Sequence, residues 1–324
     1  MMRSNPLALT VAVLVGWSAP AFAQHYAFER SLDTSAAATL DVTTHRGRIT
    51  ITADAVDIIR VRGTVTVRVA IDAPLDAVAR AQRLAANPPI EQVGDRVQLG
   101  PPSDDTDRRA VTISYDVIVP ASVRVIANSN SGAVTITGVR GQDTAHTQSS
   151  ALTLSRLAGP AEITTGSGGV NVDDVGGAVD ITTSSSAINA RRLKSDVRVK
   201  TGSGAVSVES TGPGDVDVTT SSSAITVEGA THSLRVRSGS GHIKVAGRPG
   251  AAWSLANSSG GIDVGLGSGS AAAIDASTRS GSILLTNLQV SGTQARQNVH
   301  GTIGAGGPSL EISNSSGTIE IRGR

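Results

Sequence analysis

Short stretches of alternating apolar and polar residues recur along the chain in pairs. The stretch "VKTGSGAVSVESTGPGDVDVTTSSSAITVEG", Val199 to Gly229, holds one full period: an apolar pair follows each Gly/Ser cluster and another precedes the next cluster. The pairs that come after a cluster are Val134/Ile136, Leu152/Leu154, Val170/Val172, Val206/Val208, Ile225/Val227, Ile243/Val245, Ile262/Val264, Ile283/Leu285 and Ile319/Ile321. The pairs that come before a cluster are Ala161/Ile163, Val179/Ile181, Val197/Val199, Val216/Val218, Leu234/Val236, Trp253/Leu255 and Leu310/Ile312. Each pair predicts a short strand with one buried face, because alternate side chains of a strand point to opposite sides.

The serines at the centres of the clusters give the period. A nearly constant spacing of about 18 residues separates Ser131, Ser149, Ser167, Ser185, Ser203, Ser222, Ser240 and Ser259, and Ser280 and Ser316 continue the series after longer insertions. One such unit cannot bury its apolar face alone, whereas stacked units share a core. The pattern predicts an all-β fold, a parallel β-helix (β-solenoid) of about ten Gly/Ser-turn repeats. Gly-Ser-Gly and Ser-Ser-Ser clusters alternate, so one turn of the solenoid takes either about 18 or about 36 residues.

The Gly/Ser clusters themselves have two interpretations. A phosphate-binding loop needs a lysine or a helix start after its glycines. Here an apolar strand follows each cluster, and the cluster recurs many times. We therefore interpret the clusters as sharp turns, in which Gly tolerates positive φ and Ser bonds the local backbone.

The segment before the repeats has a different pattern. "THRGRITITADAVDIIRVRGTVTVRV" predicts two or three strands with a turn at Arg46-Gly47-Arg48. A short helix is expected from Pro74 to Ala86, with Leu75, Val78 and Leu84 on one face, followed by a hairpin from Gln92 to Leu99 turning at Gly94-Asp95. The polar stretch "GPPSDDTDRR" is expected to be a solvated linker.

The chain divides into three expected parts. Residues 1–23 resemble a signal peptide: Arg3 precedes the apolar run Leu7 to Trp17, and Ala21-Phe22-Ala23 forms an A-x-A cleavage site before Gln24. Residues 24–130 are expected to cap the solenoid, because an open end exposes unpaired strand edges, and residues 131–324 to form the repeats. We expect an exported protein, periplasmic, cell-surface or secreted, that is not inserted in the membrane after cleavage.

Composition narrows the classes of partner. Without Arg3, 27 basic residues balance 27 acidic ones, and no stretch is strongly basic, which disfavours nucleic acid and anionic membranes. After cleavage only four aromatic residues remain to stack on sugars or bases: Tyr26, Phe28, Tyr115 and Trp253. The chain has no cysteine, which excludes disulfides and thiolate metal sites.

The candidate metal ligands are sparse. The six histidines, His25, His45, His146, His232, His242 and His300, include no pair at metal spacing, and we expect them to face solvent. Asp104, Asp105 and Asp107 could bind calcium, but the stretch lacks the glycine and the distal glutamate of a calcium loop. Asp173-Asp174 is not repeated in neighbouring units, so it forms no calcium ladder. We predict no metal, cofactor or catalytic residue.

The order of these elements resembles a known family. A strand pair, a short helix, a hairpin, "YDVIVPASVRVIANSNSGAVTI" with Val119-Pro120, and repeated "SGxVxV" units resemble the putative-adhesin family of bacterial exported proteins, a domain of unknown function. The resemblance covers most of the chain after residue 23. It implies a β-helix fold and a location in the envelope or outside the cell, and it supplies no functional residues.

Two classes of function fit the sequence. The first is a non-enzymatic structural, adhesive or scaffolding module that contacts an envelope or extracellular macromolecule. The second is a polysaccharide lyase or glycosidase, which requires clustered carboxylates or basic residues in a groove. The expected loops are short and only Lys194, Lys200 and Lys244 supply lysine, so the sequence favours the first class.

Overall fold

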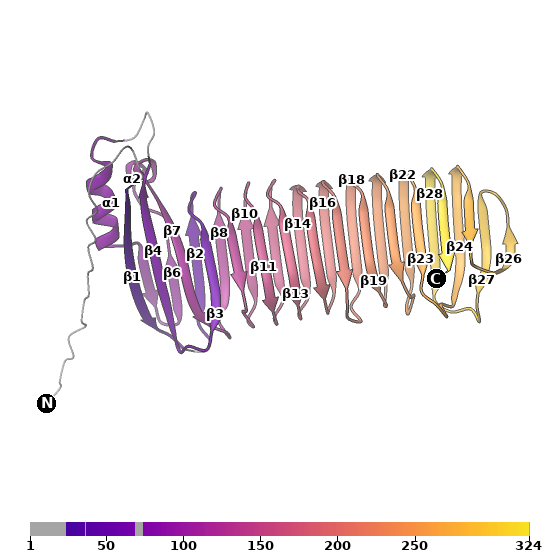
Figure 1. The fold of residues 1–324 in the computed structure, drawn as a ribbon, viewed down its shortest axis with the longest axis horizontal. Coiled ribbons are helices and arrows are strands. Elements are labelled where there is room, and N and C mark those ends of the chain that lie inside the picture. Colours follow the sequence, from indigo (N-terminus) through magenta and orange to yellow (C-terminus); the bar gives the residue numbers. More distant parts are fainter. Residues whose placement is uncertain (1–23, 36, 69–73, 324) are drawn as a thin grey trace.

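The structure is a computed structural model that describes residues 24–35, 37–68 and 74–323. The predicted signal peptide, including Ala23, lies outside the described residues, and Gln24 is the first of them. The chain winds into a long solenoid in which successive strands alternate between two sheets, and the described helices lie at its N-terminal end (Figure 1). The described residues contain no helix long and apolar enough to span a bilayer.

Two sheets, here called A and B, form the solenoid, and nearly all of their pairings along its length are parallel. In spatial order sheet A contains β1 (His25–Asp33), β4 (Ile58–Val67), β7 (Val111–Pro120), β3 (Ile49–Asp54), β9 (Val134–Thr137), β11 (Leu152–Leu157), β13 (Val170–Val175), β15 (Ile188–Leu193), β17 (Val206–Ser210), β19 (Ile225–Ala230), β21 (Ile243–Gly247), β23 (Ile262–Leu266), β29 (Ile319–Gly323) and β25 (Ile283–Thr286). Sheet B contains β26 (Val290–Gln294), β27 (Asn298–Ile303), β24 (Ala272–Ser280), β28 (Ser309–Ser316), β22 (Trp253–Ser259), β20 (Leu234–Ser240), β18 (Val216–Ser222), β16 (Val197–Ser203), β14 (Val179–Ser185), β12 (Ala161–Thr165), β10 (Asp143–Thr147), β8 (Arg124–Ser129), β2 (Thr39–Thr44), β6 (Arg96–Leu99) and β5 (Ile90–Val93). The predicted parallel β-helix is confirmed.

Strand register settles the length of one turn. Asp143 pairs with Ala161, and Ala161 pairs with Val179, so one turn has the shorter of the two lengths that the sequence allowed and holds one strand of each sheet. Ser203 lies between Ser185 and Ser222 in register. Gly-Ser-Gly turns therefore stack on Ser-Ser-Ser turns rather than on their own kind.

The predicted apolar pairs form the core. Val206 and Val208 are 2% and 1% exposed, and Ser207 between them faces solvent. The exception is at the C-terminal end of sheet A, where Leu285 is half-buried because β25 is the last strand. Trp253 is fully buried, and its Nε1 donates to the carbonyl of His232 at 2.8 Å.

Both ends of the solenoid interleave segments that are distant in sequence. The coil β2/β3 lies between the strands β6/β7 and the coil β8/β9, and the coil β28/β29 lies between β22/β23 and β24/β25. Antiparallel strands cover the two ends: β1 and β4 beyond β7, and the hairpin β26–β27 beyond β24. These strands protect edges of the parallel coils that would otherwise be open to pairing (Figure 1).

The N-terminal region confirms most of the expected elements. The strands β2, β3 and β4, the turn Arg46–Arg48 and the hairpin β5–β6 around Gly94-Asp95 all form. Helix α1 (Ala77–Ala86) is shorter than predicted, and its buried residues are Ala77, Ala81 and Leu84. Of the predicted helix face, Leu84 is confirmed as buried, whereas Leu75 and Val78 are exposed and were predicted wrongly. Small alanines let the helix pack closely on β4 and β1.

Candidate functional site

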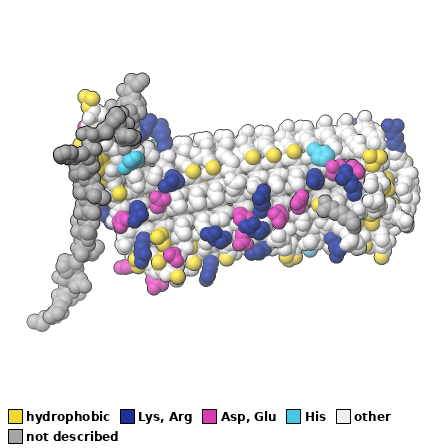
Figure 2. Space-filling view, in the orientation of Figure 1, with side chains coloured by type: hydrophobic (Ala, Val, Ile, Leu, Met, Phe, Trp, Pro, Cys, Tyr) yellow, Lys and Arg dark blue, Asp and Glu magenta, His cyan; other side chains and the backbone are white. Residues whose placement is uncertain are grey.

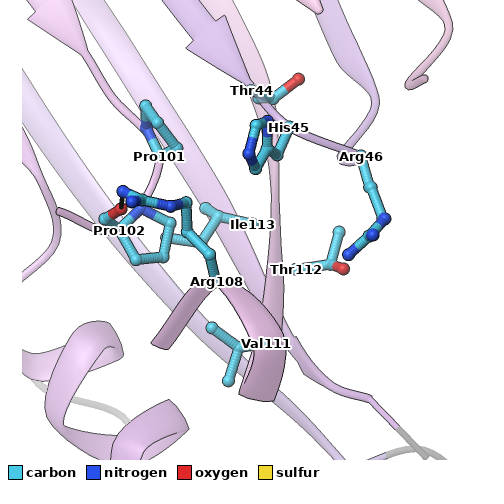
Figure 3. Close-up of a pocket in the computed structure, with 9 residues that line it drawn as sticks. All are labelled: Thr44, His45, Arg46, Pro101, Pro102, Arg108, Val111, Thr112 and Ile113. Carbon is cyan, nitrogen blue, oxygen red and sulfur yellow. Dashed lines mark hydrogen bonds between the residues drawn. The ribbon is translucent and has the colours of Figure 1, made fainter. Parts of the chain in front are cut away.

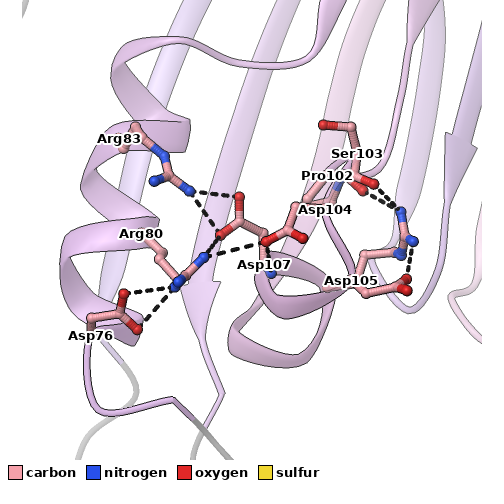
Figure 4. Close-up of polar contacts among 9 residues, drawn as sticks. Asp76, Arg80, Arg83, Pro102, Ser103, Asp104, Asp105 and Asp107 are labelled. Atoms are coloured by element: carbon pink, nitrogen blue, oxygen red, sulfur yellow. Dashed lines mark hydrogen bonds and ion pairs between the residues drawn. The ribbon is translucent and has the colours of Figure 1, made fainter.

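The segment expected to be a solvated linker is ordered by polar contacts (Figure 4). It contains a second helix, α2 (Asp105–Ala110), in which the Asp104 carboxylate caps the first turn by accepting from the Asp107 backbone N–H. The linker prediction was therefore wrong. An aspartate three residues before another acid is a helix N-terminal signal that the sequence contained.

The three carboxylates considered for calcium are paired with arginines. The Asp107 carboxylate is nearly buried and accepts from Arg80 at 2.8 Å and from Arg83 at 2.7 Å, while Asp105 pairs with Arg108. Arg80 donates hydrogen bonds to the carboxylates of Asp76 and Asp107, and these bonds raise the pKa of Arg80 and stabilise its charged form. This cluster joins α1 to α2 (Figure 4), and the arginines occupy the carboxylates that a cation would need.

The other candidate ligands also lie apart. All six histidines are exposed, as predicted, and three of them lie close to aspartates: His232 to Asp215 at 2.6 Å, His242 to Asp263 at 3.1 Å and His300 to Asp275 at 4.0 Å. Lys194 binds the Asp174 carboxylate at 2.7 Å and lowers the pKa of that carboxyl. Within the described ranges, no three His, Asp or Glu side chains are grouped to hold a metal ion.

A small pocket lies where the N-terminal region meets the first coils (Figure 3). Its lining includes His45, Arg46, Pro102 and Arg108, and its volume is about 10 Å³, which is room for about one water molecule. Arg108 donates to the carbonyls of Pro102 and Ser103 at 2.8 Å, so its guanidinium is already engaged. This pocket is too small for an organic ligand.

A larger groove, with a volume of about 450 Å³, runs across the C-terminal ends of the sheet A strands from β17 to β23. It is hollow because of one column of outward positions, in which Glu209 and Glu228 are followed in register by Ala246 and Gly265. The side chains of Ala246 and Gly265 are too small to fill the space that a glutamate would occupy at these positions. Arg248 lies at the far wall, where it donates to the carbonyl of Ser268.

Glu209 and Glu228 form the chemically distinctive pair of this groove. They are register partners on neighbouring strands, which lie about 4.8 Å apart. This strand spacing places the two side chains next to each other on the sheet, and retaining glycosidases use two neighbouring carboxyl groups, held about 5–5.5 Å apart. The groove is open, however, and the described residues that line it include no aromatic ring to hold a sugar.

The broad face of sheet A carries a second regular feature, here called the hydroxyl–amide column. Each of its residues points outward and is in register with the next; they are Thr50, Thr135, Thr153, Asn171, Asn189, Ser207 and Thr226. Figure 2 shows side chains in lines along the long axis, with charges gathered in a band beside uncharged surface. A flat row of donors and acceptors at strand spacing suits contact with an extended partner.

The buried acid Asp143 was not predicted from the sequence. Asp143 is fully buried in β10, at the position that Val125 and Ala161 occupy in the adjacent coils. Neither carboxylate oxygen has a hydrogen-bond partner among the described residues, and burial raises the pKa of Asp143 to about 7. The repeat register could have found it, since an inward position carries an acid where its neighbours are apolar.

Stacked two-strand coils with Gly/Ser turns define the chain as a β-solenoid. Residues 183–322 match the family described as Toastrack DUF4097, a domain of unknown function. The predicted resemblance to a family without an assigned function is thereby confirmed over these residues. No curated protein matches the chain.

A solved structure covers most of the chain at low similarity. It is the crystal structure of a putative cell adhesion protein from Clostridium sporogenes, matched over 94% of this chain and 100% of that chain, with 12% sequence identity and a TM-score of 0.22. A TM-score of this size supports no inference about this chain.

Proposed function

We propose that this protein is an exported, non-enzymatic β-solenoid whose sheet A face contacts a macromolecule of the cell envelope or exterior, in a structural, adhesive or scaffolding role. The observation that carries the proposal is the hydroxyl–amide column, which continues without a break from β3 to β19. Binding spread over equivalent coils suits a solenoid, because each coil adds a similar contact. Export is supported by the A-x-A site before Gln24.

The test compares two matched triple variants of the chain starting at Gln24. Thr135→Lys/Asn171→Lys/Ser207→Lys alters the sheet A column, and Thr164→Lys/Thr182→Lys/Thr219→Lys alters outward positions of sheet B. We expect binding to envelope fractions to fall at least tenfold for the first variant only. The single change Ser207→Ala should have little effect. Equal binding of both triple variants, or no binding by the unaltered protein, contradicts the proposal.

A second candidate function, cleavage of a polysaccharide, is favoured by the register of Glu209 and Glu228 beside the groove. It requires one carboxyl to act as an acid and the other as a nucleophile. The test is incubation with acidic and neutral polysaccharides, with and without calcium. Depolymerisation that Glu209→Gln and Glu228→Gln each abolish, and that Glu162→Gln leaves unchanged, would replace the contact-surface proposal with an enzymatic one.

A further inference from the structure

The C-terminal coil β28/β29 differs from the other coils in where its neighbours come from. Leu310 pairs with Trp253 on one side and with Ile274 on the other, and both partners lie more than one period earlier in the chain. In most of the solenoid a strand pairs with the strands one period before and after it. The last coil therefore enters a slot whose two walls, β22/β23 and β24/β25, both precede it in the sequence.

The insert, residues 309–323, is bonded to both walls. The Gly260 backbone N–H donates to the Ser316 carbonyl at 3.0 Å, and the Gly317 N–H donates to the Ser280 carbonyl at 2.9 Å. The Asn314 side chain donates to the Gly260 carbonyl at 2.8 Å. Its apolar side chains are fully buried in the shared core; they are Leu310, Ile312, Ile319 and Ile321.

Each wall also has support that does not involve the insert. The coil β22/β23 stacks on β20/β21, and β24 pairs with the hairpin β26–β27, whose Val299 and Ile303 are buried. The insert is joined to the hairpin by residues 304–308, "GAGGP", which are mostly exposed. The insert can therefore leave the slot while β22, β23 and β24 keep the strands paired on their other side, whereas β25, the last strand of sheet A, pairs with β29 alone.

The two walls are in register with each other as well as with the insert. Trp253 and Ile274 both pair with Leu310, and the sheet A strands of the walls, β23 and β25, flank β29 in the same way. Trp253 and Ile274 are also about one period apart in the sequence. The register of the two walls is therefore compatible with direct pairing between them once the insert has left.

We propose that the slot between β22/β23 and β24/β25 is a binding site for a strand–turn–strand segment. Residues 309–323 are its resident occupant and can be exchanged for the same segment of a second copy of the chain. The recognition is backbone pairing on both edges together with alternate apolar side chains entering the core, which is the mode of strand addition. Exchange between identical chains forms the same contacts, so it requires only that the resident segment leave.

The absence of native cysteine allows a direct experiment on the folded full chain. A protease site replaces residues 304–307 in the Ser254→Cys variant. After the protein has folded, the protease cuts this segment and so separates the insert from the rest of the chain. The probe is a labelled peptide of residues 309–323 carrying Glu311→Cys, because Ser254 and Glu311 are outward register partners. The control peptide carries Ile312→Asp and Ile319→Asp in addition.

In a buffer with oxidised glutathione as the oxidant, we expect the cut protein to form a disulfide with the probe peptide at least tenfold more than with the control peptide, while the resident fragment is displaced. The uncut Ser254→Cys chain should form the same disulfide more slowly. Equal capture of the two peptides overturns the proposal, as does retention of the resident fragment with no exchange. Loss of the resident fragment with no capture of the probe peptide also overturns the proposal. In that case a Ser254→Cys/Asp275→Cys variant tests whether the two walls have closed on each other, because its two cysteines then cross-link.

Discussion

Thr183 donates its hydroxyl hydrogen to Oγ of Ser186 at 2.7 Å, and both side chains are buried beneath the turn between β14 and β15. One coil further on, Gly204 stands in the place of Ser186 with φ +109°. A Cβ at Gly204 would lie 2.2 Å from the carbonyl oxygen of Ser186. The two kinds of turn therefore fit together. The serine turn buries a hydroxyl pair, and the glycine turn, which lacks a Cβ, leaves room for the carbonyl of Ser186 in the serine turn.

Replacing this glycine should be costly. Gly204→Ala adds a Cβ against backbone in a left-handed conformation, so we expect the free energy of unfolding to fall by at least about 1–2 kcal/mol. Gly169→Ala is the matched control, because a Cβ there meets no described atom within 4 Å. Urea denaturation measures both variants. Equal midpoints would show that the turns do not interlock in this way.

The alternation of buried and exposed positions predicts opposite results at adjacent residues. Val206→Asp places an unpaired charge in the core and should cost several kcal/mol, whereas Ser207→Asp should change stability by less than about 0.5 kcal/mol. Thermal unfolding of the two variants at neutral pH is the measurement. Similar melting temperatures would contradict the assigned faces.

Asp143 should make stability depend on pH. Its pKa is about 7 in the folded state against 3.8 ordinarily, so folding favours the protonated form. The contribution of this proton is fully present below about pH 4 and is lost as pH rises to 7, a change on the order of 4 kcal/mol. We expect Asp143→Val, which matches Val125 and Val179, to stabilise the protein at pH 8 and to reduce this dependence. Unfolding curves of the parent and the variant at pH 4.5 and pH 8 test this prediction. A variant that is less stable than the parent at pH 8 would contradict the conclusion that the buried Asp143 carboxyl has no partner.

The arginine cluster of the cap should hold α1 and α2 together. Asp107→Ala removes the acceptor shared by Arg80 and Arg83, and we expect a loss of about 1–3 kcal/mol with faster amide exchange in both helices. Asp105→Ala breaks only an exposed pair with Arg108 and should cost less than about 1 kcal/mol. Added calcium should leave both proteins unchanged, and a calcium-dependent rise in melting temperature for the parent would argue for a cation among these carboxylates.

Processing is open to a direct measurement. The A-x-A site predicts cleavage between Ala23 and Gln24, so the exported protein should begin at Gln24. Intact-mass spectrometry and N-terminal peptide mapping of protein from the periplasm or medium decide this. Recovery of a chain that still begins at Met1 would contradict export by this signal.

The repeated part of the fold could be predicted because each coil carries the same local pattern, as at Val206 and Val208. The stacking order at the end of the chain could not, because β28/β29 carries the same apolar pattern as the other coils and the pattern does not say which coils it pairs with. The helix face could be predicted only in part, because the helix buries the small residues Ala77 and Ala81 beside Leu84, and alanine has no strong preference for either face. The groove forms because Ala246 and Gly265 have small side chains where the preceding coils carry glutamates, and this difference is visible only when consecutive coils are aligned in register.

The interleaved C-terminal coil gives the protein a mechanical property. A load applied at the C-terminus acts first on a strand pair that is bonded along both edges, so several hydrogen bonds must shear together before the end opens. An end coil bonded along one edge would instead peel off one bond at a time. A tether attached at this end would therefore hold a pulling force that an ordinary last turn of the same length would not.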